Sequence, residues 1–395
     1  MGDEDVRDPG ESGDPNDWWI ERFFGAIDQL IERGMDKAEA PRRALQAFTE
    51  TIANVAPEHA EAIEATGREY LDESAQYRAG FVERLRVHWG DALDLYELIV
   101  SVVEDGATKF AERNLASNGS YTLLLDVLAQ LTGQAIRVAR EVHALLTAGF
   151  PLGAHALART VHEVSVRADV LRAFGASDEH ADLAERFVLH DQVINYRDAV
   201  VYQRDAERLN YELISDDDMA EMKQAHDDLI ARFGPSYGAP YGWAAGLPGL
   251  PRPTRPTFED LETLAQLDHY RGFYRWSSHF IHSDSKALRL SQVERGGSSA
   301  VLANATNTML ADPAQQTLSA LTRTFTSMVT AGQPFAFYDM LLCESLQILV
   351  TKAHNMLVDS ENAVDEAEER LQSEYRLKGQ TLTLFGSVES AERGV

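Results

Sequence analysis

Apolar side chains recur every three or four positions along most of this chain, a spacing typical of amphipathic helices. The pattern is clearest between Ser120 and Ala148. There the repeating apolar positions are Leu128, Leu131, Ala135, Val138, Val142 and Leu145. These intervals predict a helix packed nearly antiparallel to its neighbours. Gly149 followed by Pro151 predicts where it ends.

Further helices are predicted downstream. The same spacing indicates a helix at about 152–174. A serine and an aspartate at its start predict a long helix over about 178–212. Ser215 predicts the start of the next helix, which should end before Gly234. Helices are expected again over about 257–370, with two breaks.

The N-terminal part of the chain is also expected to be helical. Residues 1–16 are acidic and rich in Gly and Pro, which predicts disorder. Period-two alternation of β-branched residues is missing from the segment that follows, so strands are not expected there. Apolar stripes instead predict separate helices near 20–31, 37–54, 57–72 and 76–113.

These patterns predict an all-α protein, a multi-helix bundle with long antiparallel helices and an additional N-terminal helical region. No internal repeat or strand pair is predicted. The expected divisions are a disordered acidic tail (1–16), an N-terminal helical region (17–115), a helical bundle core domain (116–365) and a C-terminal tail (366–395).

One long irregular stretch, 234–256, interrupts the helices. It is rich in Gly and Pro and contains Tyr237, Tyr241 and Trp243. Structureless segments of this length are uncommon inside a compact domain and often serve as functional loops or linkers. The aromatic residues indicate that it packs on something. Two interpretations stay open, namely an ordered connector without chemistry and a flap over the helix that follows.

The balance of charge limits the partners of the protein. Lys and Arg total 36 against 63 Asp and Glu, giving a formal net charge of -27. Such a surface favours solubility and repels nucleic acid over most of its area, so bulk DNA binding is not expected. Residues 252–295 are the local exception, with seven basic and six acidic side chains. RNA would therefore have to bind at a local basic groove near this segment.

Cysteine content and N-terminal composition predict a cytoplasmic protein. Cys343 is the single cysteine, so no internal disulfide can form. The N-terminus lacks the basic region of a secretory signal. The apolar stretch Pro334–Val350 is shorter than the ~20 residues of a membrane span, so it is expected to be a buried helix and no membrane partner is expected. No cofactor motif is recognised, and no cofactor is expected.

The stripe with the most chemistry lies near residue 275. At about 100° per residue, one ridge of a helix would carry four polar residues. They are Arg271, Arg275, Ser278 and His282. Two cations, a hydroxyl and an imidazole could hold a phosphate and transfer a proton. In this interpretation His282 is the acid/base, Arg275 clamps the phosphate, and the other two assist.

Arg275 and His282 also resemble the Arg-x4–6-His signature of the HEPN superfamily of helical nucleases. The resemblance implies metal-independent cleavage of RNA by a homodimer whose two motifs face each other. The polar residue that usually follows the arginine is replaced by Trp276. In the structural alternative, the arginine and histidine form salt bridges and helix caps.

A second polar cluster is predicted on the helix at 152–174. Arg159 and Glu163 are four residues apart and can pair, and His162 shares their side. This helix is apolar on two sides, so it is expected to be central, where charges must be paired. The cluster is therefore either a structural ion pair or a set of polar ends presented to the ridge. Tyr274 and His279 are the other candidates for supporting residues.

His279, His282 and Asp284 also suggest a metal site. Two histidines three residues apart can share a metal, but further ligands would have to come from elsewhere, such as His190 and Asp191. No Glu-x-x-His pair of the di-iron kind is present. No metal is therefore assigned.

Two stretches together resemble a bacterial family of uncharacterised helical proteins. Its members carry a Leu-x-Arg-x-x-x-Glu helix and, later, a Tyr-x-x-x-Ser-x-x-x-His helix. The matching residues here are Leu157, Arg159, Glu163, Tyr274, Ser278 and His282. The similarity covers roughly 120–355 and implies an all-helical domain with these polar residues near one another. The family has no established activity and so implies no reaction.

Two alternative functions, from different classes of protein, are consistent with these patterns. The first is a metal-independent ribonuclease-like effector, acting as a homodimer in phage defence or stress response. The second is a non-enzymatic helical scaffold or regulator, in which the ridge is a paired polar layer or a partner-binding face. The first requires the side chains of Arg275 and His282 to be accessible in one cleft. The second requires them, together with Arg159 and Glu163, to be buried and paired.

Overall fold

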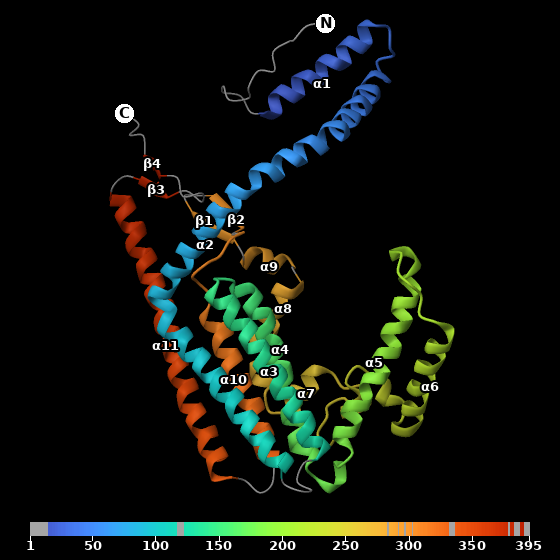
Figure 1. The fold of residues 1–395 in the computed structure, drawn as a ribbon, viewed down its shortest axis with the longest axis vertical. Coiled ribbons are helices and arrows are strands. Elements are labelled where there is room, and N and C mark those ends of the chain that lie inside the picture. The colour runs from blue at the N-terminus through green and yellow to red at the C-terminus, as the bar shows by residue number, and fades with distance from the viewer. Residues whose placement is uncertain are drawn as a thin grey trace. The chain divides into compact units, whose positions relative to one another are not determined.

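Helices make up most of the protein, as the sequence predicts (Figure 1). The computed structural model describes residues 15–116, 122–282, 284–290, 292–295, 298–301, 303–331, 336–377, 380–382 and 388–390. Most of the tail expected to be disordered, 1–14, lies outside the described residues. Pro15, also assigned to that tail, already belongs to helix α1 (Pro15–Glu32), because proline is well suited to the first turn of a helix.

The chain divides into two compact units, Met1–Gly80 and Phe81–Val395. The first unit holds α1 and the beginning of α2 (Ala40–Ala116), and the ring of Phe23 packs edge-on against that of Phe48. The prediction of three separate helices between 37 and 113 is wrong, because α2 is continuous over 77 residues. Pro41 lies in its first turn, Pro57 is accommodated in its interior, and strong helix formers surround the expected breaks.

The second unit is a helical bundle. It is built from the remainder of α2, α3 (Leu123–Thr147), α4 (Pro151–Gly175), α10 (Ala311–Ala331) and α11 (Phe337–Leu377). α4 packs against both α3 and α10, and α10 packs against α11. The largest fully buried side chains include Trp89, Tyr96, Leu128, Leu171 and Phe325. The segment 81–115, assigned from sequence to the N-terminal region, therefore contributes to the bundle core.

The turn between α3 and α4 was predicted from Gly149 and Pro151. Gly149 adopts a left-handed φ of 79° after the last turn of α3, and the amide of Phe150 donates to the carbonyl of Leu145. This pattern is the usual C-terminal cap in which glycine provides the left-handed residue. Pro151 then begins α4, where its missing N–H is not needed.

We expect Gly149→Ala to lower the free energy of unfolding by about 2–3 kcal/mol, because the left-handed backbone costs ~1–2 kcal/mol and the new Cβ would overlap its neighbours. That atom would lie 2.5 Å from Cε1 of Phe81 and 2.8 Å from the carbonyl oxygen of Thr306. Gly133→Ala, in open space on α3, is the control and should raise stability by up to ~1 kcal/mol. Equal urea midpoints for the two variants would contradict this prediction.

A hairpin of two helices, α5 and α6, follows α3 and α4 in the chain. The predicted helix over 178–212 is divided into a short 3-10 turn at Asp178–His180, α5 (Leu183–Asp205) and a second 3-10 turn at Glu207–Leu209. Asn210 has a φ of 54°, a conformation that ends a helix. The predicted cap of α6 (Asp216–Phe233) is confirmed, since the hydroxyl of Ser215 accepts the amide of Asp218 at 3.1 Å.

The irregular stretch 234–256 packs on α5, as its aromatic residues indicated. Tyr237 is fully buried and donates its hydroxyl to the carbonyl of Arg186 at 2.6 Å. Trp243 packs edge-on against Phe187, with ring centroids 5.0 Å apart. Its two buried anchors thus hold it against α5 and not over α8 (Arg271–His282), which favours the connector interpretation.

The rest of the second unit consists of short elements. They are α7 (Phe258–Leu264), a 3-10 turn (Asp268–Tyr270), α9 (Ser285–Leu290), and the antiparallel pairs β1 (Gln292–Arg295) with β2 (Ser298–Val301) and β3 (Gln380–Leu382) with β4 (Val388–Ser390). These two ribbons were not predicted, because strands of three or four residues carry too little alternation.

The apolar stretch 334–350 lies partly in α11. Cys343, Leu346 and Val350 are buried, but Ile348 is 70% exposed, so α11 is amphipathic there and the prediction of a fully buried helix is wrong. Residues 334–335 lie outside the described residues. Within the described ranges, no helix combines the length and apolar character needed to cross a membrane.

Candidate functional site

Helix α8 carries most of the predicted site and packs against α4. Its inner side holds the buried Ser277 and also Phe280, whose ring lies 5.3 Å from that of His155 on α4. Burial lowers the pKa of His155 to about 4, so this imidazole is neutral at pH 7. The opposite side of α8 presents Arg275 and His282, which are both exposed.

The first polar network joins α4 to α8 through Tyr274. Glu163 accepts hydrogen bonds from the guanidinium groups of Arg159 and Arg167, at 3.2 and 3.1 Å. The Tyr274 hydroxyl donates to Glu163 at 3.1 Å and accepts from Arg159 at 2.6 Å. Burial, followed by the charge of Glu163, raises the pKa of Tyr274 to about 12, so the phenol stays protonated and can donate.

The second network joins α4 to α7 and α8 through Glu262. This carboxylate is fully buried, with Arg271 at 2.7 Å from one oxygen and Nε2 of His162 at 2.9 Å from the other. The guanidinium of Arg271 also lies over the Tyr274 ring, 5.0 Å from its centroid. Arg271 and His162 are thus held by an internal carboxylate, as buried charges usually are.

On the outer side of α8 the structure orients His279. Its Nδ1 lies 2.6 Å from a carboxylate oxygen of Asp284, just beyond the helix. The other oxygen of Asp284 accepts the amides of Lys286 and Ala287 at the start of α9. The hydrogen bond from His279 is the main cause that lowers the pKa of Asp284, so this residue is a carboxylate at neutral pH.

The predicted ridge of four residues is therefore divided. Arg275 and His282 lie on the exposed side of α8 and form no ion pair or side-chain hydrogen bond with the described residues. Arg271 turns to Glu262, and the Ser278 hydroxyl donates to the carbonyl of Tyr274 at 2.6 Å. His279 and Asp284, by contrast, join the exposed pair to form the outer α8 site.

Sequence reasoning missed Glu262 as a member of the polar layer. Its position four residues after the buried Phe258 was the available signal, because residues four apart share one side of a helix. The capping box of Thr257 and Asp260 fixes the start of this helix and turns Glu262 inward. Its partner His162 is 100 residues away in sequence, so the pairing itself had no local signal.

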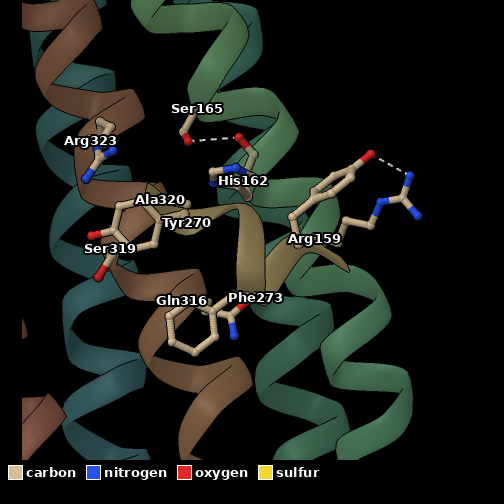
Figure 2. Close-up of a pocket in the computed structure, with 10 residues that line it drawn as sticks. Arg159, His162, Ser165, Tyr270, Phe273, Gln316, Ser319, Ala320 and Arg323 are labelled. Atoms are coloured by element: carbon tan, nitrogen blue, oxygen red, sulfur yellow. Dashed lines mark hydrogen bonds between the residues drawn. The ribbon is translucent and has the colours of Figure 1, made fainter. Parts of the chain in front are cut away.

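A pocket lies on the inner side of α8, between this helix, α4 and α10 (Figure 2). Its enclosed space has a volume of about 20 Å³, enough for about one water. The residues around it are Arg159, His162, Ser165, Tyr270, Phe273, Tyr274, Gln316, Ser319, Ala320 and Arg323. None of these side chains is acidic.

Fold and site together define an all-helical protein whose central helix α4 is joined to α7 and α8 by two polar networks. Residues 125–298 match the model of a family of unknown function, DUF5677. This span contains both polar networks and every residue of the two motifs recognised in the sequence, whereas α10 and α11 lie beyond it. No curated protein and no solved structure matches the chain.

The side chains of the site offer nitrogen and oxygen atoms, but these do not converge as metal ligands. In the described part of the chain, no three His, Cys, Asp or Glu side chains come together in a way that could hold a metal ion. The Nδ1 atom of His279 is engaged by Asp284, which leaves its Nε2 for proton transfer or ligand binding.

Proposed function

We propose that the protein is a metal-independent ribonuclease-like effector whose chemistry takes place at the outer α8 site. The observation that carries this proposal is the imidazole of His279, held by Asp284 at 2.6 Å and one helical turn from the exposed Arg275. An imidazole oriented by a carboxylate is a common general acid/base, and a nearby guanidinium suits a phosphodiester. The spacing of Arg275 and His282 adds the resemblance to HEPN nucleases.

The reaction would be a transfer at phosphorus within the RNA chain. Nε2 of His279 takes the proton of a ribose 2′-hydroxyl, and the 2′-oxygen attacks the neighbouring phosphorus. The bond from phosphorus to the 5′-oxygen breaks, and protonated His282 gives its proton to that oxygen. The products are a 2′,3′-cyclic phosphate and a 5′-hydroxyl. Arg275 stabilises the negative charge that grows on the phosphoryl oxygens.

Pairing of two chains belongs to the same proposal. A single exposed helix side gives little enclosure, and binding sites that exclude water strengthen every charge interaction within them. A homodimer that faces two copies of the outer α8 site would supply this enclosure. A cytoplasmic role in phage defence or stress response is the setting we propose for such an effector.

A scaffold or regulatory protein is the second candidate, and a specific observation favours it. Arg159, Glu163 and Arg271 are all paired within the protein, and so are His162 and Tyr274. Such a layer of satisfied charges can fix how α4, α7 and α8 pack without binding anything. In that case the outer α8 site is a solvated helix surface.

Incubation of the purified protein with a mixed-sequence RNA in the presence of a chelator tests the proposal. We expect cleavage by the wild type and its loss in an Arg275→Ala, His279→Ala double variant. Products should end in a cyclic phosphate. The matched control is His226→Ala, because this residue on α6 also lies beside an aspartate, at 3.0 Å from Asp227. Intact RNA with the wild type, or equal cleavage by the double variant, would favour the scaffold.

A further inference from the structure

The inner pocket holds a cation that no carboxylate neutralises. Arg323 on α10 is half-buried, and its guanidinium lies over the ring of Tyr270, 5.3 Å from the centroid. Among the described residues, Arg323 has no carboxylate within ion-pair distance. Partly buried charges are normally paired, and this chain carries a net charge of -27, so acidic partners are plentiful elsewhere. The missing counter-charge points to an anionic ligand.

A neutral donor lies on the same side of α10. The Nε2 atom of Gln316 is buried and has no hydrogen-bond partner among the described residues. Gln316, Ser319 and Arg323 follow at intervals of three and four, so they share one side of the helix, and all three line the pocket. A buried donor without a partner costs ~1–3 kcal/mol, which a ligand oxygen would offset.

The two carboxylates of the polar networks beside the pocket are already occupied. Glu163 is held by Arg159, Arg167 and Tyr274, and Glu262 by His162 and Arg271. Neither lines the pocket. Arg159 lines the pocket from α4, and its five N–H groups exceed the two bonds it donates to Glu163 and Tyr274. Figure 2 places Arg159 on the opposite side of the pocket from Arg323, so the donors for an anion come from α10.

The rim of the pocket is aromatic. Phe273 is 45% exposed there, and Tyr270 lies one turn earlier along the chain. Figure 2 shows Arg323, Ser319 and Gln316 along α10 and the rings of Tyr270 and Phe273 beside them. The enclosed space between these residues is about 20 Å³, room for about one water, so most of a ligand would lie outside it, at the open mouth beside Phe273. An exposed ring of this kind can stack on a planar group.

We propose that this pocket binds a small ligand that combines a phosphate group with a planar ring, as a nucleoside monophosphate does. One phosphate oxygen enters the pocket beside Gln316, and Arg323 binds the phosphate from the same side of α10. The planar ring of the ligand stacks on Phe273 at the rim. The site is separate from the outer α8 site and does not depend on RNA cleavage.

Titration calorimetry of the full chain with adenosine 5′-monophosphate, inorganic phosphate and adenosine tests this assignment. We expect the monophosphate to bind most tightly and adenosine least tightly. Arg323→Ala should weaken the binding of both the monophosphate and phosphate at least tenfold. Gln316→Leu should weaken both in the same direction and leaves the stacking of Arg323 on Tyr270 intact. Phe273→Ala should weaken the monophosphate alone.

Two controls separate this site from the rest of the protein. Arg172→Ala removes another α4 cation, one that is 3.7 Å from Asp169, and should leave every affinity unchanged. His279→Ala should also bind the monophosphate normally, so the failure of RNA cleavage would not affect the result. Absence of binding by the wild type at millimolar ligand would overturn the proposal. So would adenosine binding as tightly as the monophosphate, or equal losses in Arg172→Ala and Arg323→Ala.

Discussion

Replacement of Glu262 by alanine is expected to lower the free energy of unfolding of the Phe81–Val395 unit by about 3 kcal/mol. The side chain is fully buried and its two oxygens hold His162 and Arg271. Alanine would leave the guanidinium of Arg271 without its counter-charge and the ring of His162 without its hydrogen-bond partner, and breaking a buried ion pair from one side typically costs ~3–5 kcal/mol. The lower end of that range applies here, because Arg271 is 31% exposed and can regain water.

Urea denaturation followed by circular dichroism measures this effect. Glu259→Ala is the matched control, since Glu259 belongs to the same helix but is 55% exposed, and its ion pairs are at 3.8 Å. Its change should stay within ~0.5 kcal/mol. Glu262→Gln keeps the shape and removes the charge, so it should fall between the two. If both alanine variants unfold at the same urea concentration, Glu262 does not organise the interior as we argue.

The helices that the sequence predicts best are those with a clear end signal. α3, α4 and α6 begin and end close to the expected residues, because Gly149, Ser215 and Gly234 act through their own backbone geometry. The predicted breaks within α2 are wrong, because the apolar pattern is weak there but the chain still contains strong helix formers. Hydrophobic periodicity locates a helix, but only a cap or a breaker locates its end.

The candidate site shows the same limit at the level of tertiary structure. Helical spacing placed Arg275 and His282 on one side of α8, and both are exposed there. Spacing gave no indication that Arg271, on the neighbouring turn, would bind a carboxylate from α7. The predicted ridge spans a range of angles around α8. A residue at its edge, such as Arg271, can contact the helix that packs beside it. Partners distant in sequence decide the role of each edge residue, and periodicity contains no information about them.

The two polar networks and the inner pocket also share one structural cause. α4 lies between α3, α10 and α8, so several of its polar groups meet a packed neighbour. Where the neighbour supplies a hydrogen-bond partner, as Glu262 does for His162, a paired layer results. Where α10 supplies Arg323 in place of a carboxylate, positive charge remains uncompensated beside a small cavity. Burial of charge on one helix thus produces both a stabilising layer and a candidate ligand site.

His279→Ala should lower the rate of RNA cleavage by about 10²–10⁴-fold if the outer α8 site is catalytic, since general acid/base catalysis contributes that much. Asp284→Asn should lower the rate less, because asparagine can still cap α9 through the amides of Lys286 and Ala287 but no longer provides the charge beside the imidazole. Single-turnover rates of these two variants and of the His279→Ala, Asp284→Asn double variant, measured with one RNA substrate, give the coupling between the two residues.

The double variant should be no slower than His279→Ala alone, because Asp284 acts only through the ring that it orients. The Asp227→Asn variant removes the other aspartate that lies beside a histidine, on α6, and should leave the rate unchanged. If Asp284→Asn slows cleavage as strongly without His279 as with it, the carboxylate acts on the substrate by another route. The assignment of His279 as the oriented acid/base would then have to be given up. If Asp284→Asn has no further effect once His279 is replaced, the carboxylate acts through the imidazole and the imidazole acts on the phosphodiester.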